Sequence, residues 1–211
     1  MTNLLIFGDS ITWGAWDEES GGWAQRLRNE LDKRTIKGEI YCVTYNLGVS
    51  GETTEFLLER LESEIKARVE PGEESILIFA IGANDSQWIN KQKKNRCSPQ
   101  DFNSNIQKII KTAEKYSKKI IFLGITPIDE KKVDPIPWAM DRSYKDKFRK
   151  EFNDLIKSAC QDSKVRFIDV FDKLMDSGYK ENLLDGVHPN AGGHKKIFKI
   201  VKDFLNRNKI I

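Results

Sequence analysis

The sequence predicts an α/β fold in which a five-stranded parallel sheet is covered by helices on both faces. Segments with the apolar character of strands alternate with segments of helical periodicity, and residues 75–81 form an almost unbroken apolar run. Such a run is typical of a central parallel strand that is buried on both faces. The alternation implies right-handed crossovers between parallel strands. A length of 211 residues suits one core, so we expect a single domain over residues 1–211.

Five short segments have the composition of strands, since they are apolar or rich in β-branched and aromatic residues. The first four end at turns that contain glycine or proline, where a strand is expected to stop. The predicted strands are residues 3–7, 40–47, 75–81, 119–125 and 165–169.

The intervening segments place apolar residues three or four positions apart, which is the spacing of one helix face. Two helix starts carry capping signals, because Thr53 or Thr54 opens the second helix and Ser98 with Pro99 opens the third. We expect the buried stripes to be Trp23, Leu27 and Leu31; Phe56, Leu57, Leu61 and Ile65; Phe102, Ile106, Ile109 and Ile110; Phe148, Phe152, Leu155 and Ile156; and Ile197, Ile200, Val201, Phe204 and Leu205.

Two connecting segments are long. Residues 86–98 are polar and basic, with Lys91, Lys93, Lys94 and Arg96, and we interpret them as a solvated loop. Residues 128–141 carry two prolines and are long for a loop in a compact domain. Two interpretations of this second segment are open, a functional flap and an insertion.

The composition excludes several classes of protein. Lys and Arg number 35 against 32 acidic residues, and this net charge of +3 is spread along the chain, whereas a nucleic-acid-binding protein needs a larger or clustered excess. The odd set Cys42, Cys97 and Cys160 lacks Cys-x-x-Cys spacing and predicts free thiols. The N-terminus has no basic leader and no run is long enough to cross a bilayer, so we expect a cytoplasmic protein without integral membrane association.

Ser10 is the candidate nucleophile. It follows the first strand in the triplet Gly8-Asp9-Ser10, and the loops at the carboxyl ends of strands hold the ligand in open α/β sheets. The alternative is that Asp9 or Ser10 only caps the next helix.

A serine nucleophile requires a base, and the chain has only two histidines. His194 falls within the last predicted helix, whereas His188 lies in an irregular loop three residues after Asp185. His188 is therefore the candidate base and Asp185 its candidate partner. A surface histidine beside a capping or ion-pairing aspartate is the alternative.

Gly48 and Asn84 follow the second and third strands. The backbone N–H of Gly48 could approach a substrate oxygen because the residue has no side chain. The amide of Asn84 could donate to the same oxygen. Each residue also has an ordinary explanation, a strand end for Gly48 and a turn for Asn84.

Four short blocks together resemble the GDSL or SGNH hydrolase family, in that family's order. The blocks begin at Gly8, Gly48, Gly82 and Asp185, and read Gly-Asp-Ser, Gly-Val-Ser-Gly, Gly-Ala-Asn-Asp and Asp-Gly-Val-His-Pro. They span most of the chain. The resemblance implies a flavodoxin-like three-layer α/β/α sandwich, which agrees with the five predicted strands.

The resemblance also implies roles for these residues. Ser10 would be the nucleophile, His188 the general base and acid, and Asp185 the residue that orients the imidazole. The oxyanion hole would comprise the backbone N–H groups of Ser10 and Gly48 and the side-chain amide of Asn84. The implied enzyme is a serine esterase that hydrolyses carboxylic esters of small molecules or lipids through an acyl-enzyme and needs no cofactor or metal.

The substrate and the oligomeric state stay open. A thioesterase, a lysophospholipase and a carbohydrate O-deacetylase are alternatives on the same site. Four tryptophans follow strand ends and could form a wall for the substrate or could pin loops. These are Trp13, Trp16, Trp88 and Trp138.

Two other classes of function are also open. Asp9, Asp85, Asp185 and His188 could bind a metal for phosphoester hydrolysis, although no Asp-x-Asp motif supports this. A non-catalytic module that binds small molecules is the other class, and the chain has no Walker-type phosphate loop.

Overall fold

The computed structural model describes residues 1–175 and 177–211. Its main sheet is entirely parallel, with the strand order β2-β1-β3-β6-β8. The predicted α/β class and the five-stranded parallel sheet are therefore confirmed. The strands are β1 (Thr2–Gly8), β2 (Cys42–Gly48), β3 (Glu74–Ala80), β6 (Lys119–Leu123) and β8 (Arg166–Ile168).

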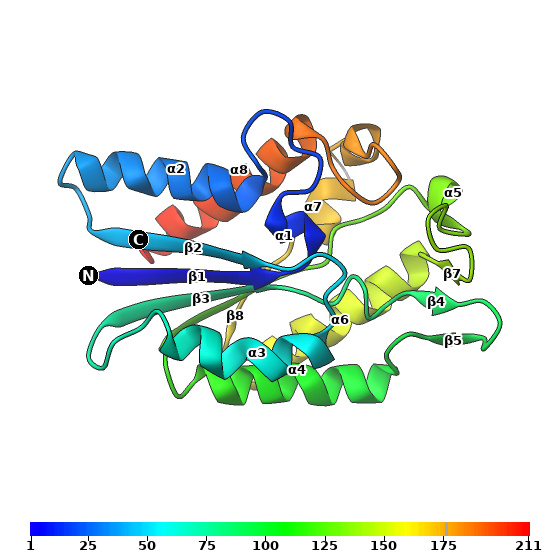
Figure 1. Cartoon of the computed structure of the whole chain (residues 1–211), viewed down its shortest axis with the longest axis horizontal. Helices are drawn as coiled ribbons and strands as arrows, with labels where there is room; N and C mark the ends of the chain where they lie inside the picture. Colours follow the sequence, from blue (N-terminus) through cyan, green and yellow to red (C-terminus); the bar gives the residue numbers. More distant parts are fainter. Residues whose placement is uncertain (176) are drawn as a thin grey trace.

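Helices cover both faces of this sheet and make three layers (Figure 1). Because successive side chains of a strand point to opposite faces, β1 sends Leu4 and Ile6 into one core and Leu5 and Phe7 into the other. The first face is covered by α2 (Trp23–Ile36) and α8 (Ala191–Arg207), and the second by α3 (Thr54–Lys66), α4 (Pro99–Ala113) and α6 (Asp146–Asp162).

Short elements gather at the carboxyl edge of the sheet, at the right of Figure 1. The strand order changes direction there, because β2 lies on one side of β1 and β3 on the other. Open α/β sheets bind their ligands at such a point. The short elements are α1 (Ser10–Trp13), α5 (Glu130–Val133), α7 (Phe171–Met175) and the 3-10 helix η1 (Tyr179–Asn182).

The basic segment 86–98 differs from the predicted solvated loop. It contains β4 (Trp88–Ile89) and β5 (Lys94–Asn95), which pair with each other. On its other side β4 pairs with β7 (Arg142–Ser143), which completes a small antiparallel sheet. Strands of two residues are too short to show a hydrophobic period, so the sequence pattern could not reveal them. The lysines are exposed as expected, but Ser86, Gln87 and Asn95 are buried.

The segment 128–141 has a small core of its own. Ile128, Val133 and Ile136 are fully buried and pack with Tyr144 and Val187. The segment is therefore packed rather than loosely extended, and it joins β6 to the small sheet.

Two details of α3 correct the sequence analysis. Phe56 is 50% exposed, because only Leu57, Leu61 and Ile65 face the sheet. Thr53 occupies the N-cap without a side-chain hydrogen bond. The carboxylate of Asp85 caps the helix instead, accepting the backbone N–H of Thr54 at 3.1 Å.

Two further properties concern the whole chain. Cys42 and Cys160 are buried, Cys97 is half-buried, and all three are free thiols. Within residues 1–175 and 177–211, no helix combines the length and apolar character that a membrane span requires.

Candidate active site

The turn after β1 presents Ser10 at the carboxyl edge of the sheet. Asp9 is the N-cap of α1, and its Oδ1 accepts the backbone N–H of Ile11 at 3.0 Å. Asp9, and not Ser10, therefore caps the helix. The Ser10 hydroxyl is left available for other contacts. Ser10 is 8% exposed at the first position of α1.

A continuous hydrogen-bonded chain links Ser10 to His188 and Asp185. Ser10 Oγ lies 2.9 Å from His188 Nε2, and His188 Nδ1 lies 2.6 Å from Asp185 Oδ2. A carboxylate can only accept, so Nδ1 carries the proton and Nε2 is left to accept the serine hydroxyl. The structure thus brings together three residues that are up to 178 positions apart.

The local turn fixes Asp185. Its Oδ1 accepts the backbone N–H groups of Val187 at 2.9 Å and of His188 at 2.8 Å. Partial burial acts to raise the pKa of Asp185, but the hydrogen bonds from the His188 side chain and from these two N–H groups outweigh it. The pKa of Asp185 is held well below its usual range, so the carboxylate stays ionised.

Gly48 lies next to Ser10 because β2 pairs with β1 in a register that sets Gly48 beside Gly8. A Cβ atom on Gly48 would stand 2.3 Å from the backbone nitrogen of Trp13, so only glycine lets α1 pack against this strand. The Gly48 N–H donates to Asn46 Oδ1 at 3.1 Å, and Asn46 Nδ2 donates to the carbonyl of Thr12 at 2.9 Å. The predicted oxyanion donor is thus already engaged by a neighbouring amide.

Asn84 lies on the other side, in the loop after β3, and a fixed network orients its amide. Its Oδ1 accepts the hydroxyl of Tyr144 at 2.8 Å and Nε2 of Gln87 at 3.3 Å. Its Nδ2 donates one hydrogen to the carbonyl of Glu52 at 3.0 Å. Among the described residues, the second amide hydrogen has no acceptor.

Two of the four tryptophans flank His188. The indole N–H of Trp16 donates to Asp185 Oδ2 at 3.0 Å, and the rings of Trp16 and His188 meet edge to face with centroids 5.7 Å apart. The ring of Trp138 lies 5.9 Å from that of His188.

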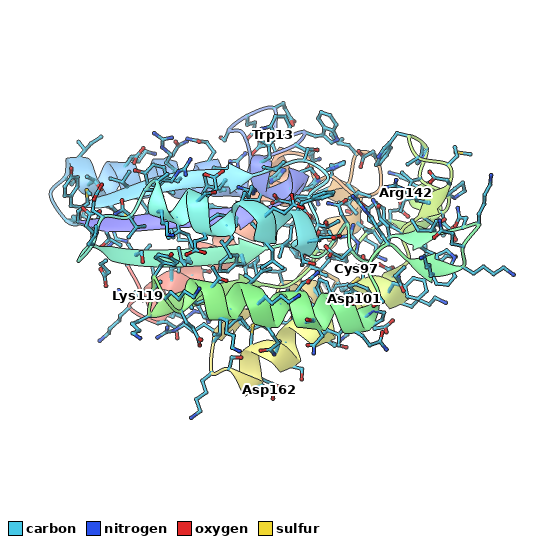
Figure 2. All side chains as sticks on the ribbon, turned by 60° about the horizontal axis from the view of Figure 1, so that its bottom comes forward. Trp13, Cys97, Asp101, Lys119, Arg142 and Asp162 are labelled. Carbon is cyan, nitrogen blue, oxygen red and sulfur yellow. The ribbon has the colours of Figure 1, made fainter. Side chains whose placement is uncertain are left out.

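The other two tryptophans have different surroundings. Trp13 is 56% exposed at the end of α1, where it points out near the top of Figure 2. Trp88 stacks on Phe148 with centroids 4.8 Å apart, so it packs the small sheet against α6.

A buried cation lies beneath this edge of the sheet. The guanidinium of Arg149 is fully buried, donates to the carbonyl of Thr126 at 3.2 Å and lies 4.5 Å from the ring centroid of Tyr144. Burial raises the pKa of Asp9, and the Ile11 N–H and the charge of Arg149 oppose that rise.

Sequence reasoning missed several residues that support the site. Arg149 had a signal, because it shares the helical spacing of Phe152 and Ile156 on the buried face of α6. Asn46, Gln87 and Tyr144 had none that a single sequence can show. Asn46 contacts Thr12 and Tyr144 contacts Asn84 across distant segments, and the short-range contact of Gln87 with Asn84 has no sequence pattern of its own.

The carboxylates proposed as an alternative metal site are engaged separately. Asp9 caps α1, Asp85 caps α3, and Asp185 holds its own turn. In the part of the chain that the structure describes, no three His, Cys, Asp or Glu side chains cluster in an arrangement that could hold a metal.

The fold is a three-layer α/β/α sandwich that carries a hydrogen-bonded serine, histidine and aspartate at the carboxyl edge of its parallel sheet. A family model described as the GDSL-like lipase/acylhydrolase family matches residues 6–196, and the chain belongs to this family. It is accordingly a carboxylic ester hydrolase by class. No curated protein sequence matches the chain significantly.

Solved structures share the fold over nearly the whole chain. A lipase/acylhydrolase from Enterococcus faecalis has a TM-score of 0.76 at 19% identity, with 99% of this chain and 97% of that chain covered. A lipolytic G-D-S-L family protein from Veillonella parvula has a TM-score of 0.74 at 19% identity, with 98% and 100% covered. The acetylxylan esterase Axe2 from Geobacillus stearothermophilus has a TM-score of 0.71 at 21% identity, with 97% and 92% covered. At these identities the likeness shows the fold.

Proposed function

We propose that the protein is a serine esterase that cleaves carboxylic esters of small molecules or lipids with Ser10 as nucleophile. The observation that carries the proposal is the unbroken chain from Ser10 Oγ through both ring nitrogens of His188 to Asp185. This arrangement supplies a nucleophile, a base within reach of its proton, and an ionised carboxylate that orients the base.

In the first half of the reaction, Ser10 Oγ attacks the acyl carbon while its proton passes to His188 Nε2. Asp185 stabilises the imidazolium that forms. The imidazolium then gives its proton to the leaving alkoxide oxygen as the ester C–O bond breaks, which leaves an acyl group on Ser10. In the second half, water loses a proton to His188 and attacks the acyl-enzyme, and the acid and Ser10 are released.

The negative charge of the tetrahedral intermediate needs preorganised donors. The backbone N–H of Ser10 and the second amide hydrogen of Asn84 fill this role in the proposal. The Gly48 N–H would be shared with Asn46 Oδ1, at 3.1 Å, or would turn from it to the oxyanion.

Exposed apolar side chains surround the site and support a substrate with an apolar face. Trp13, Trp16 and Leu184 line an open hollow of about 570 Å³, and all three are more than half exposed. A thioester, a lysophospholipid and an acetylated sugar are the comparison substrates that would separate the alternatives within this class.

Hydrolysis of p-nitrophenyl acetate, butyrate and octanoate tests the proposal, with wild type and Ser10→Ala assayed in the presence and absence of a chelator. We expect wild-type turnover that ignores the chelator and disappears in Ser10→Ala. The matched control is Ser104→Ala, which removes an exposed hydroxyl from α4. Turnover that survives in Ser10→Ala would overturn the nucleophile, and chelator sensitivity would favour the metal alternative.

A further inference from the structure

Two arginines approach one neutral oxygen beside the candidate site. Arg96 Nη1 lies 3.4 Å and Arg142 Nη1 lies 3.3 Å from Oε1 of Gln87, which is a buried residue. Both distances are long for a hydrogen bond. Two like charges at a single amide oxygen repel each other, and that repulsion is relieved when an anion binds between them.

The charges of these arginines are poorly compensated by the protein. Arg142 has a 3.5 Å contact with the exposed carboxylate of Asp141. For Arg96, no carboxylate among the described residues lies within 4.0 Å, and its remaining contact is the carbonyl of Gly51 at 3.5 Å. The pair therefore carries more positive charge than its one neighbouring carboxylate, that of Asp141, compensates.

Gln87 connects this cationic site to the candidate oxyanion hole. Its Nε2 donates to the hydroxyl of Tyr144 at 2.7 Å and lies 3.3 Å from Oδ1 of Asn84. One side chain thus contacts the two arginines through its oxygen and the Asn84 network through its nitrogen. A single side chain therefore separates the two arginines from Asn84.

A groove extends outward from Arg96. It encloses about 850 Å³ between α3, α4 and the β4–β5 hairpin, and Figure 2 shows Cys97 and Asp101 of its lining toward the same end of the molecule as Arg142, away from Lys119. Lys93, Lys94 and Lys108 line it and form no ion pair among the described side chains.

The acidic residues of the groove offset part of this charge, because the lining holds four cations, Lys93, Lys94, Arg96 and Lys108, and three carboxylates. Asp85 caps α3 and Asp101 accepts the hydroxyl of Ser98. Glu55 is the third acidic residue of the lining. The groove and the arginine pair together present a positive surface beside the site.

We propose that the non-reacting part of the substrate carries a carboxylate or phosphate group, which binds between Arg96 and Arg142 at the inner end of the groove. This inference rests on the proposed esterase function. Carboxylates and phosphates match the planar guanidinium and form short charge-assisted hydrogen bonds with it. Those bonds replace the two long contacts to Gln87 and supply the remaining counter-charge.

Matched ester pairs test the inference, because each pair differs in charge and little else. On the alcohol side, 4-acetoxybenzoate and 4-acetoxyphenyl phosphate are compared with neutral 4-acetoxybenzamide. On the acyl side, mono(4-nitrophenyl) adipate is compared with 4-nitrophenyl hexanoate. We expect kcat/KM to favour the anionic member of at least one pair by about tenfold, the effect of one net charge-assisted hydrogen bond. The preferred member shows which anion binds and on which side of the ester.

Variants and salt then locate the effect. In Arg96→Gln and Arg142→Gln the ratio of the two kcat/KM values should fall toward one, while Arg28→Gln on α2 should leave it unchanged. The ratio should also fall with rising salt in the wild type, because salt screens exposed charges. The salt series uses only the wild type, so its result does not depend on whether a variant folds.

Three outcomes would overturn the inference: no anionic preference in either pair, a preference that persists in both arginine variants, or a preference that is insensitive to salt. If the wild type hydrolyses the neutral esters and Ser10→Ala does not, the proposed function stands whatever the ratio is. If the wild type hydrolyses none of these esters, the proposed function itself fails.

Discussion

At the scale of single residues, the orientation of Asn84 depends on Tyr144. An asparagine amide can flip by 180°, which exchanges the positions of Oδ1 and Nδ2. The hydroxyl of Tyr144 selects one of these orientations by donating to Oδ1 at 2.8 Å. Burial raises the pKa of Tyr144, which keeps the hydroxyl protonated and able to donate. The NH2 group is thereby directed toward Glu52 and the site.

We therefore predict that Tyr144→Phe lowers kcat by about tenfold with little change in KM, because the oxyanion donor loses its fixed orientation. Asn84→Ala, which removes the donor, should lower kcat by on the order of 100- to 1000-fold. Steady-state kinetics on p-nitrophenyl butyrate measures both, with the exposed Tyr41→Phe as control. A Tyr144→Phe variant with normal kcat, or one with only a raised KM, would contradict the positioning role.

Trp16 has two competing interpretations, a wall for the substrate and a support for Asp185. The residue adopts a left-handed backbone conformation with φ of 66°, which is unfavourable for a bulky side chain, and its indole N–H reaches Asp185 Oδ2. A donor to the carboxylate stabilises the anion and so weakens the hold of the Asp185–His188 pair on a proton. The hydrogen bond favours the supporting role.

Trp16→Phe keeps a ring and removes the donor, so the two interpretations give different results. If Trp16 supports Asp185, loss of the donor should shift the acid limb of the kcat/KM profile upward by a few tenths of a pH unit. A full unit would correspond to about 1.36 kcal/mol, so the expected effect is modest. Trp13→Phe, on an equally exposed neighbour, should leave the profile in place. An unmoved profile with a KM that changes with acyl chain length would identify a substrate wall instead.

At the scale of elements, Asp85 ties the loop after β3 to the start of α3. Its carboxylate accepts the backbone N–H and the hydroxyl of Thr54, the latter at 2.6 Å, yet burial raises its pKa to about 6 against these hydrogen bonds. An unfolded aspartate titrates near 3.9. The folded protein therefore binds more protons than the unfolded chain between those values, so the contribution of Asp85 to stability is full below about pH 4 and is lost as the pH rises through about 6.

Asp85→Asn removes this titration and keeps an oxygen that can accept the Thr54 N–H. We predict that the free energy of unfolding of the wild type, minus that of the variant, decreases as the pH rises from about 4 to 7. Urea unfolding at several pH values measures the difference, and Asp162→Asn, at an exposed position, is the control. If the difference is constant or increases with pH, the pKa of Asp85 is not raised in the folded state.

The elements also show what a single sequence can predict. The strands and the stripes of Leu57, Leu61 and Ile65 follow from the apolar period, because burial imposes that period on the sequence. The same period wrongly predicts that Phe56 is buried, because Phe56 adjoins this stripe and satisfies its spacing. The β4–β5 hairpin has no period to detect.

The candidate site divides in the same way. Ser10, Asp185 and His188 could be chosen because each sits in a short block, and the structure places them within hydrogen-bond distance. Tyr144 could not, because its contact with Asn84 spans 60 positions. Gln87 could not either, because its contact with Asn84, three positions away, follows no pattern that a sequence shows.

At the scale of the whole molecule, the candidate site depends on the two ends of the chain meeting. Ser10 follows the first strand, and His188 precedes the last helix. His194 on that helix is fully buried, with Nε2 2.9 Å from the carbonyl of Ala15 and Nδ1 3.2 Å from the backbone nitrogen of Trp23. Nε2 therefore donates and Nδ1 accepts, which requires a neutral ring. Through these two hydrogen bonds His194 contacts the chain on both sides of Trp16.

Protonation of His194 would remove the acceptor for the Trp23 N–H. Burial lowers its pKa below the usual range of about 6.5. The unfolded chain thus binds more protons in that window, so the contribution of His194 is full above about pH 6.5 and is lost as the pH falls toward the lowered folded-state value. We predict that the free energy of unfolding of the wild type, minus that of His194→Gln, decreases from pH 8 to pH 5. Urea unfolding of both proteins measures it, and the opposite contribution of Asp85 cancels in the difference. A difference that stays constant across this range would show that the pKa of His194 is not lowered in the folded state. The two ends of the chain would then be joined by packing alone.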